Sequence, residues 1–126
     1  MIKYKFIKED VLKLGESDYL LIAESPYELL SQMFEGNESV EEIDEIIENI
    51  EKVQSDQLEE YWFGNETGFL GIAIMDDNDD PQNWPKGAYI YDQYSEQPET
   101  HKFVLPIEDI LQILKDYKKF IVDNKQ

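Results

Sequence analysis

The segment from Glu38 to Val53, ESVEEIDEIIENIEKV, constrains the fold of this chain most strongly. With 100° between successive residues, its aliphatic side chains share one stripe and most of its carboxylates lie opposite, the pattern of a helix with one buried side. The stripe comprises Val40, Ile43, Ile46, Ile47, Ile50 and Val53. Ser39 and Glu42 are spaced as a capping box, in which each side chain accepts a hydrogen bond from the backbone amide of the other. The segment therefore predicts an amphipathic helix that begins next to Ser39.

This predicted helix is unusually acidic. Its sixteen residues include seven carboxylates and a single lysine. Glu48 and Lys52 form one favourable pair four residues apart, whereas Glu41 and Glu45 repel each other at the same spacing. Because self-repulsion of this kind destabilises a compact state, we infer that a function other than stability maintains the charge.

The whole chain is acidic as well, with 29 Asp and Glu against 11 basic residues and a formal net charge of −18. All the basic residues are lysines, and between residues 14 and 114 there are only Lys52, Lys86 and Lys102. Nucleic acid and anionic lipid are poor partners for such a chain, because they bind through clustered cationic side chains. A positively charged protein is the favoured partner.

Other features of the composition bound the class of protein. The chain has no cysteine, which leaves neither disulfides nor thiolate metal sites and favours the cytoplasm. No stretch approaches the ~20 apolar residues needed to cross a bilayer. A length of 126 residues with 41% hydrophobic content predicts one folded domain, residues 1–126.

Hydrophobic periodicity places strands and helices along this domain. Strands are expected at residues 2–6, 18–23, 58–63, 68–75, 88–94 and 101–105. Helices are expected from Ser25-Pro26 to Phe34, over the acidic segment, and from Pro106 to Ile121. We therefore predict an α+β fold with a single, mainly antiparallel sheet of four to six strands and about three helices.

A second acidic region, DDNDDPQNWPKG at residues 76–87, is a long loop between predicted strands. Its start matches the first three ligand positions of a calcium loop, but proline and glycine occupy the sixth and twelfth positions, so we expect no metal site. Long loops are often functional, and the tryptophan here either anchors a partner or folds back on the sheet. Both interpretations stay open. The candidate binding residues of the loop are Asp76, Asp77, Asp79, Asp80 and Trp84.

Catalytic signals are weak. The single histidine, His101, has no nucleophile or carboxylate motif beside it, and no glycine-rich phosphate loop is present. We therefore expect neither an enzyme nor a bound cofactor. A set of aromatic residues at strand spacing is interpreted as core or cross-strand pairs in preference to an exposed face. These residues are Tyr61, Trp62, Tyr89, Tyr91 and Tyr94.

Two segments, VEEIDEIIENIEKV at 40–53 and KFVLPIEDILQILKDYKKFI at 102–121, resemble immunity proteins of bacterial toxin systems, in particular those of contact-dependent growth inhibition. The resemblance implies a protein that the toxin-producing cell makes to bind the toxin domain tightly and block its active site. A nuclease toxin holds phosphates with Lys and Arg, so carboxylates at matching positions can occupy the same groove. We therefore predict an immunity protein that neutralises a basic C-terminal toxin domain of the nuclease class. Its predicted partner-binding residues are Glu41, Glu45, Glu48, Asp76, Asp77, Asp79, Asp80 and Trp84.

Two other functions stay open. An acidic adaptor or regulatory binding protein would use its charge for solubility alone and would have no toxin partner. A carboxylate-dependent metal-binding module or enzyme would melt at a higher temperature with metal or turn over a substrate.

Overall fold

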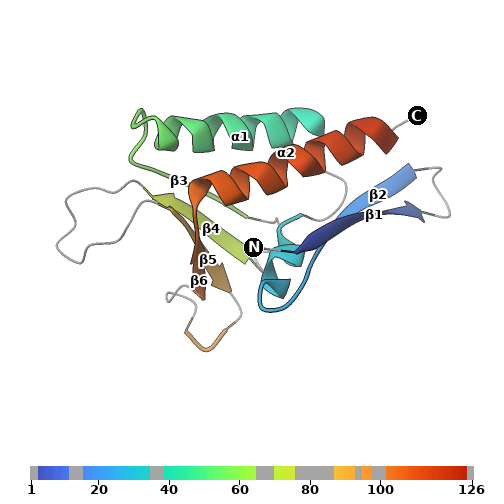
Figure 1. Ribbon diagram of the computed structural model, residues 1–126, viewed down its shortest axis with the longest axis horizontal. Coiled ribbons are helices and arrows are strands. Elements are labelled where there is room, and N and C mark those ends of the chain that lie inside the picture. Colours follow the sequence, from blue (N-terminus) through green and yellow to red (C-terminus); the bar gives the residue numbers. More distant parts are fainter. Residues whose placement is uncertain are drawn as a thin grey trace.

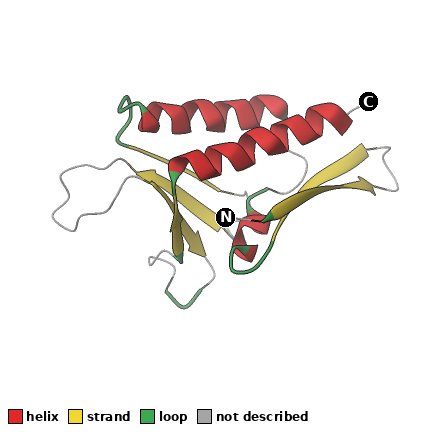
Figure 2. Cartoon of the chain, viewed as in Figure 1, coloured by secondary structure: helices red, strands yellow, loops and turns green. Residues whose placement is uncertain are grey.

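The computed structural model describes residues 3–11, 16–34, 39–64, 70–75, 87–92, 95–97 and 102–124. Within these residues the elements are β1 (Tyr4–Val11), β2 (Glu16–Ala23), the 3₁₀ helix η1 (Glu28–Gln32), α1 (Val40–Gln54), β3 (Glu60–Gly64), β4 (Leu70–Met75), β5 (Gly87–Asp92), β6 (Phe103–Leu105) and α2 (Ile107–Asn124). The two α-helices lie side by side in one layer (Figure 1), and the strands lie on one side of them (Figure 2). Neither helix in this described part combines the length and the apolarity that a membrane span requires.

The prediction of a single sheet with about three helices is wrong. Among the described residues, β1 and β2 form a separate antiparallel hairpin, while β3, β4, β5 and β6 form an antiparallel sheet in that order. The hairpin does not extend the sheet because its aromatic side chains pack on α2. The ring of Phe6 lies 5.5 Å from that of Phe120, and Tyr19 meets Phe120 edge-on at 6.0 Å. A two-stranded hairpin needs such support, since it is marginally stable alone.

The helix predicted from Ser25-Pro26 is also different in the structure. Only Glu28–Gln32 is helical, as 3₁₀ helix, and its N-cap is Tyr27, which makes no side-chain capping hydrogen bond. The buried residues Leu30 and Met33 are three positions apart. A 3₁₀ helix has three residues per turn and aligns such a pair, so this short segment buries its apolar side chains without an α-helical turn.

The acidic helix predicted next to Ser39 is confirmed. The Ser39 hydroxyl accepts a hydrogen bond from the backbone N–H of Glu42 at 3.1 Å, which satisfies one of the free donors at the start of α1. The predicted stripe faces the interior. Its buried members are Ile43, Ile47, Ile50 and Val53, and Val40 and Ile46 are partly buried against the same core.

The core lies between the helices and one face of the four-stranded sheet. From β5, Ala88 and Ile90 point into it, and from α2, Ile110 and Leu114 do the same; all four are fully buried. Alternation along the strands assigns the neighbouring residues to the opposite, outer face of the sheet. The fold therefore leaves two surfaces away from the core, the outer face of α1 and the outer face of the sheet.

Candidate functional site

The outer face of α1 carries the helical part of the predicted binding site. Glu41, Glu45 and Glu48 are all exposed there. Glu48 forms the predicted intrahelical ion pair with Lys52, at 3.6 Å between the carboxylate and the ammonium nitrogen. The helix thus holds the three carboxylates on a rigid, packed element, which is a good support for a binding surface.

The negative charge of α1 is partly balanced by α2, which the sequence analysis did not anticipate. Lys118 lies 2.6 Å from the carboxylate of Asp44, and Lys115 lies 3.7 Å from that of Glu51. These pairs join residues far apart in the chain, so spacing along the sequence gave no signal for them. They show that Lys115 and Lys118 face α1 and that α2 runs antiparallel to it, as the ribbon in Figure 1 also shows.

The opposite side of α1, over β3, has no such lysine partner among the residues that the structure describes. Helix α1 contacts β3, and Asn49 interacts there with Tyr61, so this side of the helix faces that strand. Glu42 lies two turns before Asn49 and therefore on the same side. Within the described part of the chain no ion pair reaches Glu42 or Glu45. The uncompensated negative potential of α1 is therefore directed outward and toward β3.

The pKa of Tyr61 depends on this electrostatic environment. Burial of its side chain raises the pKa of Tyr61, and the negative charge of Glu45 raises it further, while the hydrogen bond with Asn49 acts in the opposite direction. The Tyr61 ring points to the core side of β3 and stacks on Phe63 at 5.8 Å. Glu45 is therefore close enough to the β3 strand to act on groups there.

The outer face of the sheet carries a half-exposed aromatic residue. Trp62 is 50% exposed, and its ring lies 5.6 Å from that of Tyr91 with 27° between the ring planes. Tyr89 and Tyr91 are buried, and burial raises the pKa of Tyr91. The interpretation of these aromatics as core or cross-strand residues thus holds for the two tyrosines. Trp62 reaches across β4 to stack on Tyr91 of β5 and also presents apolar surface to solvent, which alternation alone did not reveal.

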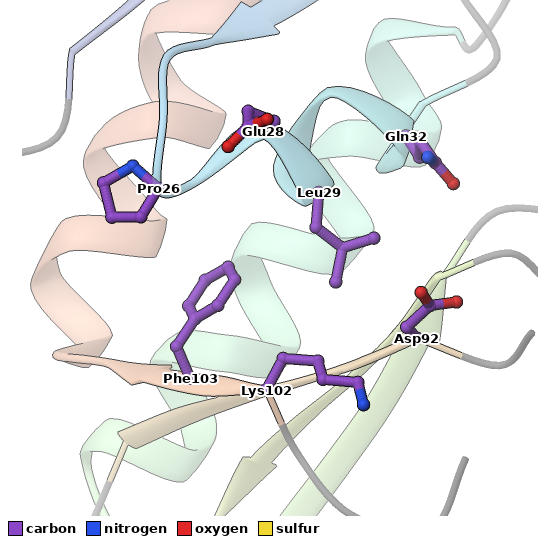
Figure 3. A pocket seen from close by; sticks show the side chains of 7 residues that line it. All are labelled: Pro26, Glu28, Leu29, Gln32, Asp92, Lys102 and Phe103. Atoms are coloured by element: carbon purple, nitrogen blue, oxygen red, sulfur yellow. The ribbon is translucent and has the colours of Figure 1, made fainter. Parts of the chain in front are cut away.

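A shallow cavity of about 430 Å³ lies between η1 and the ends of β5 and β6 (Figure 3). The side chains of Leu29 and Phe103 approach each other across it, and charged groups of both signs surround them. Its described lining comprises Pro26, Glu28, Leu29, Gln32, Asp92, Lys102 and Phe103. This set contains no nucleophile paired with a base, and its mixed charges select neither anions nor cations. We therefore do not place the functional site here.

The remaining predicted binding residues, Asp76, Asp77, Asp79, Asp80 and Trp84, lie outside the described residues, as do His101 and Tyr94. The structure therefore tests only the helical half of the predicted site. Among the residues it does describe, no group of three or more His, Cys, Asp or Glu side chains is placed to hold a metal ion.

Comparison of the chain with protein-family models, with curated proteins and with solved structures finds no match. No functional residue is therefore transferred from another protein. Two surfaces on opposite faces of β3, the acidic side of α1 and the outer face around Trp62, are the basis for assigning a function.

Proposed function

We propose that this protein is an immunity protein, which binds and neutralises a basic toxin domain of the nuclease class in the cytoplasm of the cell that makes both. The observation that carries the proposal is the one-sided charge of α1. Lysines of α2 pair with Asp44 and Glu51, whereas Glu42 and Glu45 face outward and toward β3 without an ion pair in the described part of the chain.

The physical role of such a surface is rapid capture. An uncompensated negative patch on a rigid helix attracts a positive patch over roughly one Debye length, about 10 Å at 0.1 M salt. Complementary charge of this kind raises association rates to the order of 10⁸–10⁹ M⁻¹s⁻¹ at low salt. An immunity protein benefits directly, because it must occupy the toxin before the toxin reaches its nucleic-acid substrate.

The same surface suits inhibition of a nuclease. The substrate groove of a nuclease is lined with cationic side chains that hold phosphates, and carboxylates compete for them. Exposed carboxylates spaced along α1 at positions 41, 45 and 48 present negative charges about one helical turn apart. Lysine and arginine side chains lining such a groove could pair with several of them at once.

The proposal is tested by growth rescue. If the gene next to that of this chain encodes a large secreted protein with a basic C-terminal domain, that domain is expressed in a sensitive host, with and without the full chain. We expect growth to be restored by the chain and a stable complex to be purified from the rescued cells. Failure to rescue growth or to form a complex with any such neighbouring domain would overturn the proposal.

The contribution of α1 is measured by association kinetics at low salt. Reversing three charges, with Glu41→Lys, Glu45→Lys and Glu48→Lys combined, should lower the association rate constant by about tenfold or more. The matched control combines Glu9→Lys, Glu24→Lys and Glu96→Lys, which are exposed residues outside α1 and change the net charge equally. If both triple variants slow association to the same extent, only total charge matters and α1 is not the docking surface.

A further inference from the structure

Trp62 has the geometry of a preorganised binding residue. Its strand, β3, lies at one end of the four-stranded sheet and pairs with β4 alone among the described strands. One face of its indole ring rests on Tyr91, which is only 5% exposed and therefore fixed in place, while half of the Trp62 side chain stays accessible. A rigid aromatic ring that is held before binding loses little conformational entropy on contact. Half-exposed tryptophans of this kind are enriched among the residues that dominate interface energies.

The surroundings of the Trp62 ring are negatively charged. Glu60 is two residues earlier on the same strand, so alternation places it on the same outer face, and it is exposed. Glu59 precedes it and is exposed as well. An aromatic face beside carboxylates attracts a cation, because the ring's negative quadrupole and the carboxylate charge act in the same direction.

We propose that Trp62 and Glu60 form an anchor site for a lysine or arginine side chain of the basic protein partner. The cationic group stacks on the open face of the indole ring and pairs with the Glu60 carboxylate, and the aliphatic stem of the same side chain covers the exposed apolar surface of Trp62. This inference rests on the proposed function, since it requires a basic protein as partner. It adds a second task to the binding surface: α1 determines how fast the partner arrives, and Trp62 determines how slowly it leaves.

The first test uses the full chain and the neighbouring basic toxin domain. Trp62→Leu keeps an apolar side chain but removes the π system, and we expect a dissociation rate constant about tenfold higher or more, with little change in association. Val104→Ala is the matched control, because Val104 is 38% exposed on the same outer face but belongs to β6, at the other end of the sheet. Unlike the effect of reversing charges on α1, that of Trp62→Leu should persist at high salt.

A second variant keeps the inference falsifiable if Trp62→Leu fails to fold, which circular dichroism will show. Glu60→Gln changes only one exposed group and should also accelerate dissociation, whereas Glu24→Gln, an exposed control on another part of the chain, should not. The effects of Trp62→Phe and Glu60→Gln should be non-additive in a double-mutant cycle if one cation contacts both groups. Additive effects, or unchanged dissociation with Trp62→Leu and Glu60→Gln, would overturn the anchor site.

The third test separates this inference from the proposed function by using a hexa-arginine peptide as probe. Titration of the peptide should shift the indole N–H resonance of Trp62, identified by its loss in Trp62→Phe, and Glu60→Gln should weaken the shift. Such a shift supports the anchor site even if no neighbouring toxin domain binds, an outcome that would overturn the proposed function alone. Tight binding of a toxin domain that leaves this resonance unmoved would overturn only the anchor site. Self-association of the chain that buries Trp62 without any partner would also overturn it, because the face would then be a dimer interface.

Discussion

Tyr117 is the most deeply buried of the α2 residues that contact the N-terminal hairpin. It is fully buried, its ring stacks on Phe34 at 4.4 Å with 11° between the planes, and it lies 5.6 Å from the ring of Phe6. Its hydroxyl donates a hydrogen bond to the backbone carbonyl of Tyr19 in β2. One side chain therefore contacts the hairpin strands and the segment that follows η1. We expect its removal to weaken the docking of the hairpin more than any change on the surface.

Two substitutions separate what the hydroxyl and the ring of Tyr117 each contribute to the free energy of unfolding. Tyr117→Phe removes only the hydroxyl, which should lower the free energy of unfolding by about 0.5–1.5 kcal/mol, or up to about 3 kcal/mol if the Tyr19 carbonyl is left buried without a donor. Tyr117→Ala also removes the ring and leaves a cavity, and comparable deletions cost about 3–5 kcal/mol. Because domains of this size are stable by about 5–15 kcal/mol, the alanine variant should be severely weakened.

Urea denaturation followed by far-ultraviolet circular dichroism measures both changes, and amide hydrogen exchange locates them. We expect the amides of β1 and β2 to lose protection in Tyr117→Ala under conditions where the centre of α1 keeps its own. If Tyr117→Ala and Tyr117→Phe have the same free energy of unfolding, the packing of the ring does not stabilise the fold and this reasoning is wrong. Equal loss of protection in α1 and in the hairpin would show that the hairpin is not a separately docked unit.

Three further predictions concern the N-cap of α1, an ion pair between the two helices and a tyrosine of β1. Ser39→Ala removes the N-cap of α1 and should lower the free energy of unfolding by about 1 kcal/mol in urea denaturation, whereas Ser39→Asp should restore it. Lys118→Ala breaks the exposed pair with Asp44, so a double-mutant cycle should give a coupling of only about 0.2–1 kcal/mol that decreases in high salt; a coupling unaffected by salt would contradict this. Burial of the Tyr4 side chain, and to a smaller extent its hydrogen bond to Asp116, raise the pKa of Tyr4 well above its ordinary value of 10.0. Below pH 10 the folded and the unfolded chain both keep the hydroxyl proton of Tyr4. Above pH 10 the unfolded chain releases this proton first, so the free energy of unfolding falls as the pH rises. Tyr4→Phe should therefore lessen the alkaline decline in the free energy of unfolding, and an unchanged decline would assign that loss to other groups.

The elements of this fold that depend on local signals could be predicted, whereas their partners could not. The acidic helix follows from a cap and a periodic stripe within sixteen residues, and the structure reproduces both. Alternation in β1 and β2 predicts which side chains share a face but not which element covers that face. The covering element is α2, about a hundred positions later in the chain, and its contacts with Phe6 and Tyr19 are what separate the hairpin from the sheet.

In the candidate site, too, local sequence signals predict some features, and tertiary packing determines the others. The outward position of Glu41, Glu45 and Glu48 follows from helical geometry alone. The pairing of α2 lysines with α1 depends on how the two helices pack, which no local pattern gives. The exposure of Trp62 likewise depends on which face of the sheet the helices cover. Sequence patterns could assign Trp62 to the face opposite Tyr61 without showing that Trp62 is half exposed there while Tyr89 and Tyr91 on the same face are buried.

The position of α2 also determines the direction of the negative potential that α1 keeps in the described part of the chain. By pairing its lysines with Asp44 and Glu51, α2 removes negative potential from the side of α1 that it covers. What remains is directed away from α2, outward and toward the β3 strand, and Trp62 lies on that strand. Because β3 is at the edge of the described sheet, a basic partner that reaches around this edge could also contact the outer-face aromatic surface that Trp62 forms on Tyr91. Adding positive charge at Glu42 should then impair association more than adding it at Asp44, where α2 already supplies a lysine, and equal effects would contradict this directional model.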